Sequence, residues 1–459
     1  MNPSVSTLIV PVETQVREID AKILLSCVAA ERGFPVILGS RAFLHFLISS
    51  IPRGVYVAKS MRVLSIRMFS ILRKLGHEIV AWDEEGLLRE PDPEYYRWRL
   101  SPITMRQISH LMAWGPDDAR AFREYPGYCG TPIHITGNPR VDLMRRELRA
   151  YYRPQVDSIR ERFGDFILVN TNFSKVNHFH ADLSELKQAV EGRTPDDVNP
   201  FDASKYHHKL VMFGHFKDML PRLCDALPDD TVVVRPHPAE NHAAWLAIAE
   251  HCGNLRVVNE GSVIPWMMAA KSVVANGCTT MVESAVLDIP TVSFEPTGSN
   301  EFDFELPRSV SHRTFSIDAL CETVRDIVEG KRGPLDYPQR RAKLDRHIAA
   351  LDGLLAAERI VDVLEAAGYD QKQPPAGSIG DFVRGWLHNK ARTAVKRVNM
   401  RRPGHRNSLA YHAHRFPDIS AEEIGERIAR MGRLLNRFQN VRVEAHAKYI
   451  FKITDGPGR

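Results

Sequence analysis

The sequence has few cysteines, and none lies near another. The six thiols are spread over 459 residues without a Cys-x-x-Cys pair, at Cys27, Cys129, Cys224, Cys252, Cys278 and Cys321. A disulfide framework or a structural zinc site is therefore not expected. This usage is typical of a reducing compartment and predicts a cytoplasmic protein.

The sequence also lacks long hydrophobic runs. Nothing approaches the ~18 consecutive apolar residues of a membrane span, and the most apolar stretch, residues 42–51, is interrupted by His45. Residues 1–20 contain no basic segment followed by a long apolar stretch, so we expect no secretory signal.

Metal-ligand patterns and strong charge are missing too. Histidines gather at 177–180 and 206–208, but neither group has paired carboxylates at metal spacing, so we expect no metal site. The net charge of +5 is mildly basic. It suits an anionic substrate or a membrane surface, and we expect no nucleic-acid partner.

What the sequence does have is a repeated alternation of short apolar runs and helical segments closed by glycine. The N-terminal part predicts strands at residues 6–12, 34–39, 54–58, 77–83, 110–115 and 132–137. A polar helical segment, 142–162, leads to a second series of strands at 166–172, 231–236, 255–259, 272–276 and 291–294. This alternation indicates parallel α/β sheets.

The predicted fold class is therefore α/β, with two Rossmann-like lobes facing a cleft and a basic, mainly helical C-terminal extension. The expected domains are an acceptor lobe (1–150), a nucleotide-donor lobe (151–368) and the extension (369–459), with a linker at 371–378.

The extension differs in composition from the lobes. Residues 381–406 contain eight Lys or Arg and one acid, and Phe382, Trp386 and Leu387 follow helical spacing. A basic amphipathic helix lying on a membrane surface is one interpretation. A solvated helix docked on the enzyme or on a partner is the other.

The strongest local signal is a strand that ends in Arg235-Pro236-His237-Pro238. Ligands bind at the carboxyl ends of strands in open α/β sheets. Arg235 offers a fork for a phosphate or carboxylate, and His237 can hydrogen-bond or protonate an anionic leaving group. Taken alone, the motif could also be a structural histidine in a proline turn.

A second segment follows another strand and consists of Asn276, Gly277, Cys278, Thr279 and Thr280. Hydroxyls and N–H groups at a helix start form an anion site. Glu283, one turn into the helix, can reach ribose hydroxyls. Plain helix capping by the threonines, and a solvent-facing Glu283, are the alternatives.

Two further turns belong to the first lobe. Asn138 and Arg140 lie in a Gly-Asn-Pro-Arg turn that either faces the donor or forms an ion pair between Arg140 and Asp142. The turn Asp83–Gly86 follows a strand and is either a solvated acidic turn or the source of a general base, Glu84 or Glu85.

In this order behind two α/β units, these segments resemble bacterial surface-polysaccharide glycosyltransferases of GT-B architecture. More narrowly, the acidic turn, the His-Pro motif and the hydroxyl pair are similar to those of CMP-sugar users, the bacterial sialyltransferases and the capsule or O-antigen Kdo transferases. The resemblance spans residues 1–365 through short motifs. It implies that Glu85 or Glu84 is the base, that His237 contacts the CMP phosphate, and that Thr279 and Thr280 cradle it.

The implied activity is transfer of a sugar in capsule or lipopolysaccharide biosynthesis, from a CMP-linked sugar acid such as Kdo to a glycan or glycolipid acceptor. The donor is a substrate, and neither a metal nor a cofactor is implied. Such an enzyme would be cytoplasmic or peripheral at the inner face of the membrane, with residues 381–406 as the contact.

Three alternatives remain. The Gly-Asn-Pro-Arg turn also occurs in UDP-GlcNAc 2-epimerases and in CDP-glycerol glycerophosphotransferases, so an epimerase or a CDP-alditol transferase is open. The CDP-glycerol group typically has an Asp-Tyr-Ser-Ser turn where this chain has residues 276–280. A non-catalytic GT-B scaffold of an assembly complex is the third alternative.

Overall fold

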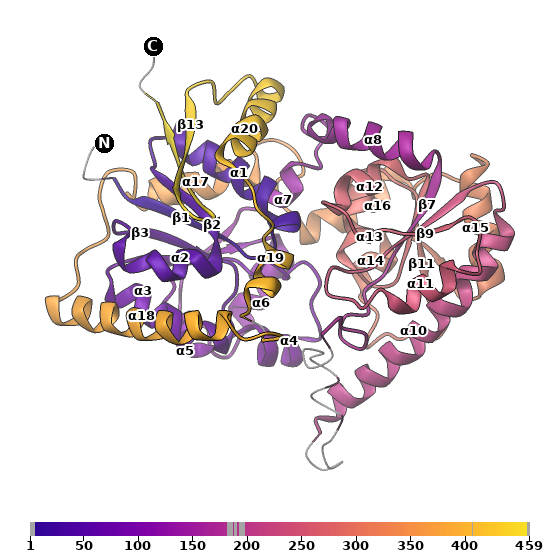
Figure 1. The fold of residues 1–459 in the computed structure, drawn as a ribbon, viewed down its shortest axis with the longest axis horizontal. Helices are drawn as coiled ribbons and strands as arrows, with labels where there is room; N and C mark the ends of the chain where they lie inside the picture. Colours follow the sequence, from indigo (N-terminus) through magenta and orange to yellow (C-terminus); the bar gives the residue numbers. More distant parts are fainter. Residues whose placement is uncertain (1–4, 181–186, 188–190, 192–197, 406, 457–459) are drawn as a thin grey trace. The chain divides into compact units, whose positions relative to one another are not determined.

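A computed structural model describes residues 5–180, 187, 191, 198–405 and 407–456 (Figure 1). The chain divides into two compact units. Unit 1 comprises Met1–Tyr151 and Asp345–Arg459, and unit 2 comprises Tyr152–Leu344. Each unit is built on its own sheet, and strands and helices alternate along each. The predicted α/β class with two Rossmann-like lobes is confirmed.

The sheet of unit 1 has eight strands in the order β13-β14-β2-β1-β3-β4-β5-β6. Strands β1 to β6 run parallel to one another, and β14 pairs antiparallel with β2. Their bounds are β1 Thr7–Val12, β2 Val36–Ser40, β3 Gly54–Ala58, β4 Glu78–Ala81, β5 His110–Ala113, β6 Ile133–Ile135, β13 Val441–Ala447 and β14 Ile450–Asp455.

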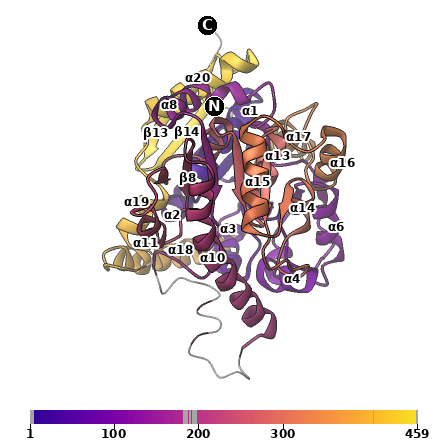
Figure 2. The same ribbon diagram turned by 90° about the vertical axis from the view of Figure 1, so that its right-hand side faces the viewer.

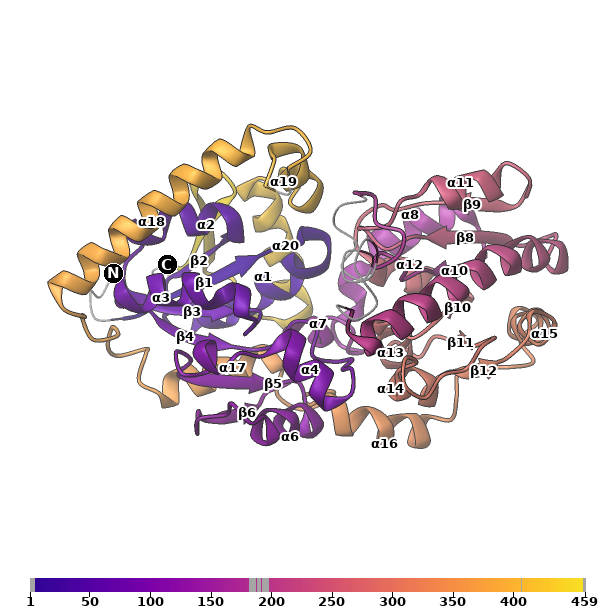
Figure 3. The same ribbon diagram turned by 90° about the horizontal axis from the view of Figure 1, so that it is seen from below.

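Helices cover both faces of this sheet. Helix α1 packs against α7, α17 and α20, while α18 packs against α2 and α3 (Figure 3). The helices of unit 1 are α1 Gln15–Glu31, α2 Arg41–Leu47, α3 Ile66–Lys74, α4 Asp92–Arg99, α5 Pro102–Met105, α6 Pro116–Glu124, α7 Pro139–Asp142, α17 Ala356–Ala366, α18 Ile379–Met400, α19 Leu409–Arg415 and α20 Ala421–Leu435.

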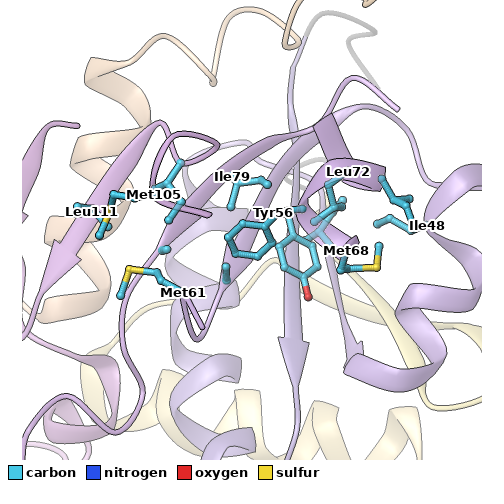
Figure 4. Packing of buried hydrophobic residues seen from close by; sticks show 14 of the residues in the cluster. Ile48, Tyr56, Met61, Met68, Leu72, Ile79, Met105 and Leu111 are labelled. Atoms are coloured by element: carbon cyan, nitrogen blue, oxygen red, sulfur yellow. The ribbon is translucent and has the colours of Figure 1, made fainter. Parts of the chain in front are cut away.

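Alternating strand residues supply the core on one face of this sheet. Tyr56 of β3 and Ile79 of β4 are direct partners in register, and both are buried against Met68 and Leu72 of α3 (Figure 4). Because a strand exposes alternate side chains to opposite faces, one apolar run packs against helices on both sides. The near-continuous apolar runs that predicted these strands follow from this double burial.

The domain boundaries differ from the prediction. Residues 345–368 were expected in the second lobe, and 369–459 as a separate extension, but both segments belong to unit 1. The hairpin β13–β14 extends the first sheet, and α17 and α20 cover α1. The physical reason is the free edge of β2 and the exposed side of α1, which these late segments bury. Arg406, the last residue of the predicted basic stretch, lies outside the described residues.

The sheet of unit 2 has six parallel strands in the order β12-β11-β10-β7-β8-β9. Read from the other edge, this is the Rossmann order 3-2-1-4-5-6. Their bounds are β7 Phe166–Asn170, β8 Thr231–Arg235, β9 Leu255–Val257, β10 Ser272–Ala275, β11 Thr291–Phe294 and β12 His312–Thr314.

Helices α10 and α15 lie side by side on one face of that sheet (Figure 2). Helix α12 packs against α8, α13 and β7. The helices are α8 Arg153–Phe163, α10 Pro200–Ala226, α11 Ala243–Ala249, α12 Val263–Ala269, α13 Thr279–Val286, α14 Glu305–Ser309 and α15 Ile317–Val328, with α16 Tyr337–His347 at the boundary between the units.

The polar helical segment predicted over 142–162 is helical in parts and interrupted between them. The chain forms α7, a short 3-10 turn at Arg149–Tyr152 and then α8, which begins immediately before Pro154. Proline fits the first turn of a helix but breaks its interior, so α8 starts there. Among the described residues, no helix has the length and apolarity needed to cross a bilayer.

Candidate functional site

Two consecutive residues after β7 join the predicted motifs of unit 2. The Thr171 hydroxyl donates to both carboxylate oxygens of Glu240, at 2.8 Å each, in the turn after β8. The Asn172 amide donates to the carbonyls of Asn276 and Gly277, at 3.2 Å each, in the turn after β10. The His-Pro turn after β8 and the turn of residues 276–280 after β10 are therefore held on either side of the carboxyl end of β7.

Glu240 fixes the shape of the His-Pro turn. Its buried carboxylate accepts the backbone N–H groups of Phe173 (2.8 Å) and His237 (3.2 Å) and the indole N–H of Trp245 (3.2 Å). Burial raises the pKa of Glu240 to about 7 despite these donors. The turn is thus ordered from within by one carboxyl group.

His237 is half-buried at the surface of this turn. Its Nδ1 accepts the backbone N–H of Ala239 at 3.2 Å. In a neutral ring this acceptor role places the proton on Nε2, which can donate a hydrogen bond. The sequence predicted a hydrogen-bond donor here, and the local geometry is suited to that role.

The turn after β10 opens helix α13. Gly277 has a φ of +52°, in the left-handed region that glycine adopts without strain. Cys278 is the N-cap residue, and its thiol lies 2.8 Å from the Thr280 hydroxyl. Thr279 and Thr280 occupy the first turn, where helical N–H groups lack partners within the helix. This arrangement suits an anion.

The strand order places these turns at the point where the sheet reverses its direction of growth. From β7 the chain builds β8 and β9 on one side and then β10, β11 and β12 on the other. In open α/β sheets, ligands bind outside the carboxyl ends of the strands at such a switch point, here between β7 and β10. Asn172 and Gly277 lie there.

Three predicted donor contacts are buried within unit 2. Arg235 is 5% exposed, and its Nη1 and Nη2 donate to the carbonyls of Glu260 (2.8 Å) and Gly261 (2.5 Å). Arg235 therefore holds the loop after β9, and both of its terminal nitrogens are engaged with carbonyl groups of that loop. The position of Arg235 at a strand end predicted a ligand contact. The sequence could not show that the carbonyls of the loop after β9 would bind its guanidinium instead.

Asn276 and Glu283 are each 3% exposed. The Asn276 amide donates to the Phe294 carbonyl at 3.1 Å and so ties β10 to β11. Its Oδ1 is buried without a hydrogen-bond partner within the described part of the chain. The solvent-facing alternative for Glu283 was wrong, because the α13 face that carries it packs inward.

In unit 1, the acidic turn Asp83–Gly86 follows β4. Asp83 accepts from Arg99 Nε at 3.0 Å and from the Tyr95 hydroxyl at 3.2 Å, so it orders the turn. Glu84 is buried, accepts the Trp82 indole N–H at 2.9 Å, and lies 3.6 Å from the Lys22 ammonium. The solvated alternative was therefore wrong for these two acids.

Glu85 is the accessible acid of the turn, with a side chain 41% exposed, and it forms an ion pair with Arg17 at 3.1 Å. Partial burial would raise its pKa, but the charges of Arg17, then Lys59 and Arg99, hold the pKa of Glu85 at about 2. Glu85 is thus ionised at neutral pH, yet it is a weak base while Arg17 remains paired.

The Gly-Asn-Pro-Arg turn also belongs to unit 1. Asn138 caps α7 by accepting the Arg140 N–H at 3.0 Å, and the Arg140 guanidinium donates to the Arg17 carbonyl at 3.2 Å. Asp142 accepts the N–H groups of Ala356 and Ala357 at the start of α17, at 2.8 and 2.9 Å. Asp142 thus anchors the segment that returns to unit 1. Donor contacts by Asn138 and Arg140 stay predictions.

The sequence did not indicate a buried charge network at the carboxyl ends of β1 and β3. Glu13 and Glu18 share the Lys59 ammonium, at 2.9 and 2.7 Å, and Lys22 pairs with Glu18 at 2.6 Å. Arg415 of α19 pairs with Glu13 at 2.9 Å. The network thus joins the C-terminal segment to the switch point of unit 1.

Sequence reasoning also missed Thr171, Asn172 and Glu240. Residues 166–172 were assigned to the strand, whereas β7 ends at Asn170 and leaves two polar residues at its carboxyl end. Polar residues ending an apolar strand were the available signal. Glu240 gave none, since an acid in a turn is ordinarily solvated. The described residues contain no group of three or more His, Cys, Asp or Glu side chains that could hold a metal ion.

Comparison with known proteins gives distant structural likenesses only. No family model matches the chain, and no curated protein matches its sequence. The wall teichoic acid polymerase TagF, in a variant with CDPG, is 13% identical over 68% of this chain and 71% of its own, with a TM-score of 0.43.

Two epimerase structures are similar at the same level. The UDP-GlcNAc 2-epimerase from Methanocaldococcus jannaschii, in complex with UDP-GlcNAc and UDP, is 12% identical over 78% of this chain and 99% of its own, with a TM-score of 0.44. A Listeria monocytogenes protein assigned as a UDP-N-acetylglucosamine 2-epimerase is 12% identical over 82% and 100%, with a TM-score of 0.49. Likenesses of this size carry no functional argument, which rests on the site itself.

Proposed function

We propose that this chain is a glycosyltransferase of surface-polysaccharide biosynthesis and that unit 2 binds its nucleotide-sugar donor. The observation that supports this most is the pairing of Thr171 and Asn172 with the turns after β8 and β10. It puts a histidine donor and a helix start at one switch point, where ligands of such sheets bind.

In the proposed reaction, an acceptor hydroxyl attacks the anomeric carbon of the donor sugar. The bond from that carbon to the phosphate oxygen breaks, and its electron pair stays on the phosphate. The growing negative charge is stabilised by the His237 Nε2 proton and by the α13 start with Thr279 and Thr280. The hydroxyl proton passes to Glu85 or Glu84 of unit 1. The donor and the acceptor are the two substrates, and the proposed reaction includes no metal or cofactor.

The finer proposal is a CMP-linked sugar acid such as Kdo, transferred to a glycan or glycolipid acceptor. It is supported by the similarity of the acidic turn, the His-Pro turn and the hydroxyl pair to those of CMP-sugar users. Glu283 is proposed to bind the donor from α13. Asn138 and Arg140 are proposed donor contacts from unit 1.

A screen of donors tests the proposal. The chain is incubated with CMP-, CDP- and UDP-activated sugars, and its melting temperature and nucleotide release are measured. We expect CMP donors to give the largest shift, and release to depend on an acceptor glycan. Interconversion of UDP-GlcNAc without acceptor would favour an epimerase, release with CDP-glycerol a CDP-alditol transferase, and no shift with any nucleotide a scaffold.

Exchange of Arg17 for glutamine tests whether Glu85 is the base. Without the guanidinium, the pKa of Glu85 rises from about 2 toward the ordinary carboxyl range. Because a base must be ionised, the rate then falls as pH drops through that raised pKa. We expect kcat of the variant to show an acidic limb at higher pH than the wild type. An unmoved limb would leave Glu84 as the base.

We also propose that helix α18 contacts an anionic membrane surface at the cytoplasmic face. The helix docks on unit 1 through Gly385, Asn389 and Thr393. Its outer side leaves Ile379, Val383 and Leu387 exposed, at 85%, 46% and 53%. Two exposed basic residues of the same helix, Arg384 and Lys390, complement anionic lipid.

Exchange of Leu387 for glutamate tests this contact by sedimentation with vesicles of phosphatidylglycerol and phosphatidylcholine. The variant removes apolar burial and adds repulsion, so we expect binding to weaken about 10-fold or more. Leu354→Glu is the matched control, because Leu354 is 54% exposed in the same unit but lies outside α18. Equal binding by both variants and the wild type would refute the contact.

A further inference from the structure

Helix α10 carries two lysines where its inward stripe should be apolar. Lys205 and Lys209 are 4% and 5% exposed, and they lie on the stripe continued by Met212 and Phe216, which are fully buried. The spacing of three to four residues puts all four on one face. Ammonium groups rarely occupy such positions without a partner.

Contacts of neighbouring residues locate Lys209 over the carboxyl ends of the strands. The Phe213 ring packs 5.4 Å from the ring of Phe173, which follows β7. His208 hydrogen-bonds at 3.2 Å to Asp303, in the segment after β11. Strand β10 lies between β11 and β7. Lys209 therefore lies above the turn after β10.

Electrostatic contacts agree with this position. The groups within range of the Lys209 charge are Asp303, Lys175, Cys278 and Glu240. Cys278 precedes α13, and Glu240 orders the turn of His237, so Lys209 lies near both turns. Asp303 already accepts from His208 and from the Ser299 N–H at 2.9 Å.

The Lys209 ammonium has acidic groups in its neighbourhood but no direct partner among the described residues. Within the residues that the structure describes, it makes no hydrogen bond and no ion pair. Burial lowers its pKa, and burial together with the Lys209 charge lowers the pKa of Lys205 to about 7. The Lys209 charge thus disfavours the charge of Lys205, and an anion beside the two ammonium groups would relieve this repulsion.

We infer that Lys209, with Lys205 one turn before it, is the cationic seat for the phosphate of the donor. The inference deepens the proposed function and rests on it for the identity of the anion. Phosphate oxygens would accept from the Lys209 ammonium on one side and from the α13 start on the other. Lys209 takes the phosphate-binding role that the sequence suggested for Arg235.

Titration calorimetry of the full chain with CMP and with inorganic pyrophosphate tests the inference. Lys209→Met preserves the length of the side chain and removes its charge. We expect it to weaken both ligands about 10- to 100-fold, the loss of one charged hydrogen bond. Lys217→Met removes a charge two turns along the same helix, where Lys217 lies over the Phe213 ring, and should leave both affinities unchanged.

The melting temperature without ligand separates binding from folding. Removing this buried charge should raise it in Lys209→Met, whereas removing a structural contact would lower it. Unchanged affinity, or lost affinity together with lost stability, overturns the inference. Lys209→Gln provides the same test if the methionine variant fails to fold.

The two proposals can fail separately. If CMP binds the wild type and Lys209→Met equally, the inference fails and the proposed function stands. If no nucleotide binds but pyrophosphate binds only when Lys209 is present, the cationic seat stands and the proposed function fails.

Discussion

Exchange of His237 for alanine is expected to lower kcat about 10²- to 10⁴-fold, the usual contribution of a positioned proton donor, with the fold retained. The ring is half-buried, and its Nδ1 accepts the Ala239 N–H within the turn. Loss of that bond is a local change, whereas loss of the Nε2 proton removes stabilisation of the leaving phosphate. Single-turnover rates with the preferred donor measure the effect.

Two substitutions separate the roles of the ring nitrogens. His237→Asn keeps an acceptor near the position of Nδ1 and removes the outer donor, so its turnover should fall as in the alanine variant. His237→Gln places an amide N–H near the position of Nε2 and should retain activity if hydrogen bonding suffices. His251→Ala is the matched control, because His251 is exposed on the same unit. Full turnover by His237→Asn would remove His237 from the mechanism.

Exchange of Glu240 for alanine should lower the free energy of unfolding of unit 2 by about 3–5 kcal/mol, the cost of breaking a buried charged network. The substitution leaves the hydroxyl of Thr171, the N–H groups of Phe173 and His237, and the indole of Trp245 without their acceptor. Denaturant titration followed by amide exchange measures unit 2 separately, since a chain of two units need not unfold in one step.

The pH dependence of Glu240→Gln adds a sign test. The folded pKa, about 7, lies above the ordinary value of 4.5. The protonated form is therefore favoured by folding, and the wild type loses stability as pH rises from about 4.5 to about 7. The glutamine variant lacks that loss, so the unfolding free energy of the wild type minus that of the variant should fall as pH rises over this window. Exposed Glu250→Ala is the control, and a rise in this quantity would contradict the burial of Glu240.

Much of the fold follows from local sequence. Buried parallel strands such as β1 and β8 read as continuous apolar runs, because both of their faces are covered. The hairpin β13–β14 lies in the extension that the sequence predicted to be mainly helical. Its place at the edge of β2, more than 400 residues away in the chain, depends on which sheet edge is open, and no local pattern encodes that.

Only those parts of the site that depend on neighbouring residues in the sequence could be predicted. The turns at His237 and Thr279 carry their signals in adjacent residues. Arg235 was expected at a phosphate. Its partners in the structure are the carbonyls of Glu260 and Gly261, which are backbone groups and therefore leave no trace in the sequence. Nothing in the sequence placed Lys209 in the site, because a lysine in a helix is ordinarily solvated. Its meaning comes from its burial on the face that α10 turns toward the sheet.

Amide exchange of the full chain with and without CMP, CDP or UDP tests most directly whether unit 2 binds the donor. We predict slower exchange with nucleotide in the segments 171–173, 237–241 and 276–282, and no change with cytidine, which lacks the phosphate. Unchanged exchange throughout unit 2, or slowing confined to unit 1, would contradict the account.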